Sequence, residues 1–120
     1  MGPRILMLDE PLAGQDKRGS HTIMDITAQL HQRGYTVIMV THNINVAAEH
    51  AKRIVVMKDA GIYMDGTPAA IFAQPQTLAK AGILPPHITR LSQSLRNHIP
   101  LTSDPLTPAE LAEMLVGMEE

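Results

Sequence analysis

The chain has 120 residues, enough for a modest core, and its formal net charge of −2 gives no basic surplus for bulk binding of nucleic acid or acidic lipid. It contains no cysteine, which excludes disulfides and thiolate zinc sites, and its 2% aromatic content argues against stacking of bases on aromatic side chains. No apolar run approaches the roughly 20 residues of a membrane-spanning helix. An acid as early as Asp9 also argues against a signal peptide.

The first half of the chain alternates predicted strands and helices. Residues 5–8 are an unbroken apolar run, typical of a strand buried on both faces of a parallel sheet. Residues 16–33 show the spacing of a helix with one apolar face, and Gly34 should end that helix. The next expected elements are a buried strand at 36–40, a short helix at 45–50, a strand at 53–57 and a hairpin turn at 59–61 with a returning strand. This alternation predicts an α/β fold with a parallel sheet.

Beyond Gly66 the pattern becomes helical. Thr67 and Pro68 are a capping residue and a proline at the first helical position, and Thr107 with Glu110 predicts a capping box for the last helix. The expected helices cover 68–72, 77–81, 88–95 and the residues that follow Pro108. We therefore divide the chain into an α/β part, residues 1–66, and a small helical extension, residues 67–120.

Polar residues follow each of the first two strands. Asp9 and Glu10 end the first strand, and His42 lies just beyond the second. Because ligands of open α/β sheets bind where parallel strands end, we expect these three side chains to share one edge. We hypothesise that Asp9 belongs to the ligand shell of a Mg²⁺ ion and that Glu10 binds an attacking water. His42 would bind a phosphate oxygen or the attacking water. If Asp9 and Glu10 were the only evidence, two solvated carboxylates in a turn would be a better interpretation than a functional site. The other histidines are interpreted as surface or helix-face residues: His21, His31, His50, His87 and His98.

The loop after the acids invites a second interpretation. Residues 14–20 have glycines spaced as in a phosphate-binding G-x-x-x-x-G-K-[ST] loop. The lysine is missing from its place, because Ser20 and His21 follow Gly19, and Asp16 would add a negative charge to the cradle. We reject a phosphate loop here and expect Asp16 to cap the following helix.

These motifs together resemble the C-terminal part of an ATP-binding-cassette (ABC) ATPase. "ILMLDEP" resembles the Walker B strand, "LAGQD" the D-loop and "VTH" the switch strand, in matching order. "AGQD", "GIYMDGTPAAIF" and "LPPHITRLSQSL" narrow the resemblance to ATPases of energy-coupling-factor and cobalt-type importers, which take up vitamins or transition-metal ions. The resemblance implies a partial RecA-like (P-loop NTPase) parallel sheet with flanking helices and a small helical appendage.

The resemblance also implies roles and partners. Glu10 and His42 become catalytic, Asp9 the magnesium-side acid, and Asp16 a residue that communicates across a dimer of ATPases holding Mg²⁺ and ATP. The expected partners are a second ABC ATPase subunit, a transmembrane coupling protein and a substrate-binding membrane subunit, with no nucleic acid. The expected location is cytoplasmic, at the inner face of the cell membrane.

The sequence departs from the family pattern in what it lacks. The Walker A loop, the Q-loop glutamine and the LSGGQ-type signature are not among these residues. We therefore expect a fragment that does not hydrolyse ATP alone. In the family fold the strand leading to Walker A lies between the strands expected here at 36–40 and 53–57. Without it these two strands must either close up or expose apolar edges, which predicts marginal stability.

Three alternatives stay open. The chain could be a non-catalytic interaction or regulatory module derived from an ABC ATPase, or a fragment of another ABC-superfamily ATPase. A histidine metal site is the weakest of the three, because neither the spacing of His42 and His50 nor that of His87 and His98 is a recognised ligand pair.

Overall fold

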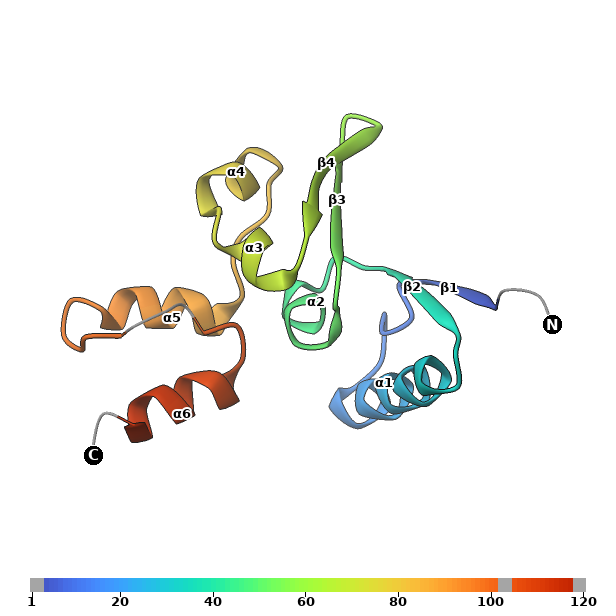
Figure 1. The fold of residues 1–120 in the computed structure, drawn as a ribbon, viewed down its shortest axis with the longest axis horizontal. Helices are drawn as coiled ribbons and strands as arrows, with labels where there is room; N and C mark the ends of the chain where they lie inside the picture. Colours follow the sequence, from blue (N-terminus) through green and yellow to red (C-terminus); the bar gives the residue numbers. More distant parts are fainter. Residues whose placement is uncertain (1–3, 102–104, 118–120) are drawn as a thin grey trace. The chain divides into compact units, whose positions relative to one another are not determined.

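The computed structural model describes residues 4–101 and 105–117, which form two compact units, Met1–His42 and Asn43–Glu120 (Figure 1). In chain order the elements are β1 (Ile5–Asp9), α1 (Lys17–Gln32), β2 (Thr36–Val40), α2 (Ile44–His50), β3 (Ile54–Lys58), β4 (Gly61–Gly66), α3 (Pro68–Phe72), α4 (Pro75–Lys80), α5 (His87–Leu95) and α6 (Pro108–Gly117). No helix in the described part of the chain is long and apolar enough to cross a membrane.

The first unit is a β-α-β arrangement. Strands β1 and β2 pair in parallel, with Asp9 opposite Val40 at the end of the pair. Asp16 caps α1 as predicted, because its Oδ1 accepts the backbone N–H of Gly19 at 2.7 Å. Gly34, with φ 96°, follows the last turn of α1 and lets the chain turn back into β2.

The apolar runs predicted that β1 and β2 are buried on both faces, and this prediction is wrong. The side chains of both strands alternate between exposed and half-buried, and Ile5 and Met7 are 63% and 66% exposed. Helix α1 contacts β2, and Leu6 and Leu8 lie on the more covered face of the pair. The opposite face consists of Ile5, Met7, Asp9, Thr36, Ile38 and Val40, all of them exposed. A continuous apolar run indicates that both faces of a strand would be stabilised by burial, but it does not show that both faces are buried.

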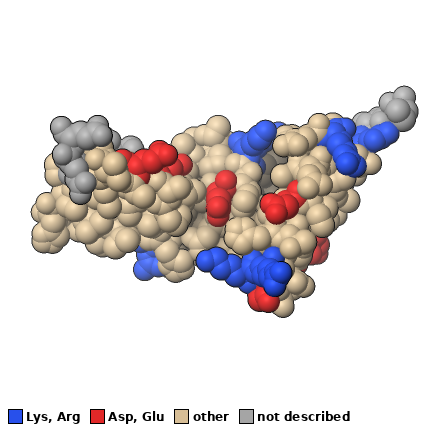
Figure 2. All heavy atoms as spheres, turned by 90° about the horizontal axis from the view of Figure 1, so that it is seen from below, with Lys and Arg blue, Asp and Glu red and all other residues tan. Residues whose placement is uncertain are grey.

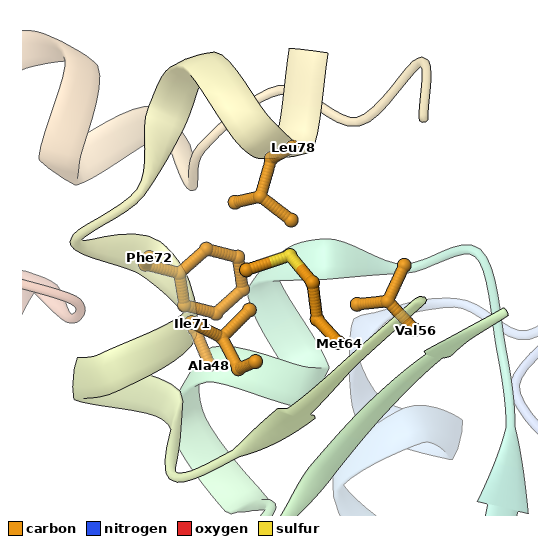
Figure 3. Packing of buried hydrophobic residues seen from close by; sticks show 6 residues of the cluster. All are labelled: Ala48, Val56, Met64, Ile71, Phe72 and Leu78. Atoms are coloured by element: carbon orange, nitrogen blue, oxygen red, sulfur yellow. The ribbon is translucent and has the colours of Figure 1, made fainter. Parts of the chain in front are cut away.

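The second unit begins with α2 and the hairpin of β3 and β4. These strands pair antiparallel, and Asp59 and Ala60 adopt positive φ in the tight turn, as two-residue hairpin loops require. A cluster of buried side chains joins this hairpin to three helices (Figure 3). Its members are Ala48, Val56, Met64, Ile71, Phe72 and Leu78.

Hydrogen bonds to main-chain groups shape the helical part of the second unit. The buried Thr89 hydroxyl of α5 donates to the carbonyl oxygen of Pro105 at 2.5 Å. Before α6, Thr107 Oγ1 accepts the N–H of Glu110, and a carboxylate oxygen of Glu110 accepts the N–H of Leu106. The predicted reciprocal cap is present, with the carboxylate reaching one residue further back than in the usual capping box.

The predicted three-stranded parallel sheet is only partly correct. The parallel pair of β1 and β2 is present, but β3 belongs to a separate two-stranded sheet, where its partner is β4. A hairpin closes over a few residues, whereas a parallel partner for β3 must come from a distant segment.

Helices fill the region after residue 66, as predicted, but they are not all separate from the strands. Helix α3 contacts β4, and Ile71 and Phe72 of α3 belong to the same cluster as Val56 of β3. The boundary expected after Gly66 therefore falls inside the second unit. As a division between an ATPase core and its extension, it stays a prediction.

Candidate functional site

Glu10 is the centre of the candidate site in the first unit. It follows β1 directly and adopts φ 45°, a left-handed conformation that is uncommon for a residue with a side chain. Its N–H donates to the carbonyl of Val40 at 2.8 Å, and its own carbonyl accepts the N–H of Ala13 at 3.1 Å. These two bonds fix the main chain where β1 turns away from the sheet.

The carboxylate of Glu10 reaches across to the residues that follow β2. Its Oε1 accepts the backbone N–H of His42 at 2.7 Å, and its Oε2 accepts the hydroxyl of Thr41 at 3.3 Å. The Glu10 side chain is 34% exposed, so it still meets solvent. Glu10 therefore links the ends of both strands and stays accessible to water.

The imidazole of His42 lies beside this carboxylate. Its Nε2 is 3.7 Å from Glu10 Oε1, too far for a hydrogen bond, and the ring is fully exposed. Such an exposed pair adds little stability even when the histidine is protonated. The ring is thus free to turn toward a ligand, whereas the main chain of the same residue is fixed.

Asp9 lies at the same edge of the sheet. It is the last residue of β1, and its side chain is exposed, on the face that also bears Met7. Within residues 4–101 and 105–117, its carboxylate has no hydrogen bond or ion pair. Mg²⁺ commonly takes one or two carboxylates together with phosphate oxygens and waters, and a free carboxylate fits that need.

Asp16 lies at the start of α1, where it is the N-cap residue. Its carboxylate accepts the N–H of Gly19, and a Cβ built on Gly19 would lie 2.6 Å from Gln15 Oε1. The amide that a phosphate loop would offer to an anion is therefore already used. The structure agrees with the rejection of residues 14–20 as a phosphate loop.

Thr41 is a contributor that the motifs did not single out, although a hydroxyl at the end of a strand, with two acids at the end of the neighbouring strand, is a usable signal. The described residues contain no cluster of three or more histidine, cysteine, aspartate or glutamate side chains that could hold a metal ion. On the face drawn in Figure 2, basic and acidic side chains are both present, in small groups.

Comparison with known proteins agrees with this geometry. The chain is 40% identical over 116 residues to the energy-coupling factor transporter ATP-binding protein EcfA2 of Streptococcus pyogenes. The chain is a homologue of ABC transporter ATP-binding proteins. The match covers 96% of this chain but only 41% of EcfA2, so the homology concerns less than half of that ATPase. No family model matches the chain.

Solved structures of ABC ATPases share the fold of this chain. The structure of cbiO1 from Clostridium perfringens, part of the ABC transporter complex cbiONQ, superposes with a TM-score of 0.56 at 28% identity and covers 78% of this chain and 37% of cbiO1. An ATP-binding cassette of another ABC transporter superposes with a TM-score of 0.55 at 21% identity, over 64% of this chain and 32% of the cassette. The predicted kinship with ABC ATPases of the energy-coupling-factor type is confirmed.

Proposed function

We propose that this chain supplies the water-activating half of an ATP-hydrolysing subunit in an ABC importer of the energy-coupling-factor type. One observation carries the proposal: the Glu10 carboxylate is fixed between the ends of β1 and β2, with the His42 ring 3.7 Å from it. Asp9 precedes it at the same edge. A base, a ring that binds phosphate and an acid for a cation are three groups that ATP hydrolysis needs together.

Each residue has a stated task in this proposal. Glu10 orients the attacking water and accepts its proton, a role suited to a carboxylate whose side chain is one third exposed. His42 holds the γ-phosphate through its exposed ring. Asp9 binds Mg²⁺, directly or through its waters, and Mg²⁺ when bound supplies charge neutralisation at the β- and γ-phosphates. Asp16 caps α1 and is proposed to contact a second ATPase subunit.

The cradle for the phosphates is not among these 120 residues. Catalysis of phosphoryl transfer is mostly positioning and charge neutralisation, so the chain alone should not turn over ATP. Activity then requires a segment with a phosphate-binding loop and, in the assembled importer, a second ATPase. A transmembrane coupling protein and a substrate-binding membrane subunit complete the proposed complex, at the inner face of the membrane. Vitamins or metal ions such as cobalt are the substrate classes that the resemblance indicates.

The test measures ATP hydrolysis by two proteins. One is the chain alone, and the other is a chimera in which the part of EcfA2 that precedes its matched 116 residues is joined to this chain. We expect turnover only from the chimera. Glu10→Gln should lower its kcat by about 10²–10⁴-fold, the usual contribution of a positioned base.

Glu113→Gln is the matched control, because Glu113 is an exposed carboxylate on α6, in the other unit. This variant should keep the activity of the chimera. Equal losses from Glu10→Gln and Glu113→Gln, or hydrolysis by the chain alone that Glu10→Gln abolishes, would contradict the proposal. A chimera that folds but keeps full activity without the Glu10 carboxylate would contradict the role of Glu10 as the base, and a folded chimera without ATP hydrolysis would favour the non-catalytic module.

A further inference from the structure

The contacts of Glu10 contain a feature that the proposed roles do not use. A catalytic carboxylate needs one oxygen for water, yet both oxygens of Glu10 point toward β2 and accept hydrogen bonds there. The bond from the His42 main chain is short, at 2.7 Å, and the bond from the Thr41 hydroxyl is longer, at 3.3 Å. A hydroxyl bond of that length is weak and easily released, since such bonds are usually 2.5–3.0 Å long.

The main chain gives a reason why Glu10 needs this support. With φ 45°, Glu10 is in a left-handed conformation that is strained for an L-residue and that persists only when neighbouring contacts enforce it. A side chain on such a turn, one third exposed, has other positions open to it. The Thr41 hydroxyl and the His42 N–H, on successive residues after β2, select one of these side-chain positions.

We infer that Thr41 is a positioning residue for Glu10. The His42 N–H anchors Oε1, and the Thr41 hydroxyl holds Oε2 until a water and a phosphate replace that weaker bond. Thr41 thus keeps the carboxylate at the edge of the sheet without touching the reacting atoms. This inference rests on the proposed function for its consequence in catalysis, but the positioning itself is a property of this chain.

A purely structural role for Thr41 would have a different signature. Threonine is favoured in strands because its side chain branches at Cβ, and valine has the same branch without the hydroxyl. Thr41→Val therefore removes the donor and keeps the shape, whereas Thr41→Ser keeps the donor and removes the branch. Thr36 lies at the other end of β2, and its exposed hydroxyl makes no bond with the described residues, so Thr36→Val is the matched control.

The first measurement is hydrogen exchange of the His42 amide in the 120-residue chain, followed by NMR. Loss of the Thr41 hydroxyl should let the carboxylate leave the amide more often. We expect exchange to become about three- to tenfold faster in Thr41→Val, with Thr41→Ser near the original rate and Thr36→Val unchanged. Unchanged exchange in Thr41→Val, or a change equal in Thr41→Ser, would overturn the inference. Thr41→Ala provides a second reading if Thr41→Val does not fold.

The second measurement uses the ATP-hydrolysing chimera described above. Thr41→Val should lower kcat about three- to tenfold and leave the KM for ATP unchanged, because the bond concerns the base and not nucleotide binding. A raised KM with unchanged kcat would contradict the inference. An inactive chimera would count against the proposed function alone, because the exchange of the His42 amide still decides whether Thr41 positions Glu10.

Discussion

The two compact units of this chain differ in how they treat apolar side chains. Of the eight buried hydrophobic residues in the described part of the chain, seven belong to the second unit, and Leu12 is the exception in the first. In the first unit, the strand residues Ile5, Met7, Ile38 and Val40 are between 42% and 66% exposed. The unit with the candidate site is therefore the one with the smaller core.

This difference shows that the geometry of the site does not depend on a well-filled core. The Glu10 contacts come from strand register and from hydrogen bonds to residues 40, 41 and 42, which a two-stranded parallel pair already supplies. Stability, by contrast, depends on buried apolar area, at about 25 cal/mol per Å². Under the proposed function, a partner segment would therefore add to the geometry of the candidate site rather than create it.

The largest expected effect on stability lies in the second unit. Leu78 of α4 is fully buried among Met64, Phe72 and their neighbours, so Leu78→Ala should lower the free energy of unfolding by about 2–5 kcal/mol. Met7→Ala, at a residue that is 66% exposed in the first unit, should cost well under 1 kcal/mol. Chemical denaturation of both variants tests the comparison. Equal losses would show that the exposed face of β1 and β2 is covered in solution.

Local features of this fold were predictable because their causes are local. The caps by Asp16 and Thr67, the turn at Asp59 and the helix end at Gly34 each follow from a residue type and its immediate neighbours. The meeting of Glu10 with residue 42 was predictable for a different reason. Two apolar runs joined by a helix make a parallel pair, and parallel strands end at the same edge.

Other features depended on contacts that the sequence does not reveal. The apolar runs at 5–8 and 36–40 cannot show that one face of the pair β1 and β2 is exposed. Strand β3 pairs only with β4 in the described part of the chain, and this outcome depends on which other strands are available to pair with it. The hydrogen bond from the Thr41 hydroxyl to Glu10 depends on the positive φ of Glu10, and no residue type in the sequence predicts that conformation.

A smaller effect separates two roles of Asp16 in the first unit. Its carboxylate caps α1 through Gly19, so Asp16→Ala should lower the free energy of unfolding by about 0.5–2 kcal/mol. Asp16→Asn should keep stability within a few tenths of a kcal/mol, because asparagine is an equally good cap. Thermal unfolding checks this expectation. Lower ATPase activity of the chimera with Asp16→Asn, at unchanged stability, would then reveal the contact proposed with a second subunit.

The smallest expected effect concerns the edge of the second unit, where Arg53 and Asp65 form an exposed ion pair. Two guanidinium hydrogen bonds, from Nε at 2.8 Å and from Nη2 at 2.6 Å, lower the pKa of the Asp65 carboxyl in the folded chain. The same bonds raise the pKa of Arg53. Because the carboxyl pKa is lower in the folded chain, the pair's contribution is complete above the unfolded value, about 3.9, and is lost as pH falls through the folded pKa.

Arg53→Gln removes the charge from this pair and tests that linkage. At pH 6 the variant should melt within about 2 °C of the original chain, since exposed pairs are weak and screened by salt. The difference in Tm should shrink as pH falls from about 3.9 through the lower folded pKa of Asp65, below which the carboxyl is protonated in both states. A difference that stays constant down to pH 2 would mean that Arg53 acts by packing its aliphatic stem on the hairpin and not by its charge, which would give this unit one more apolar contact and widen its contrast with the first.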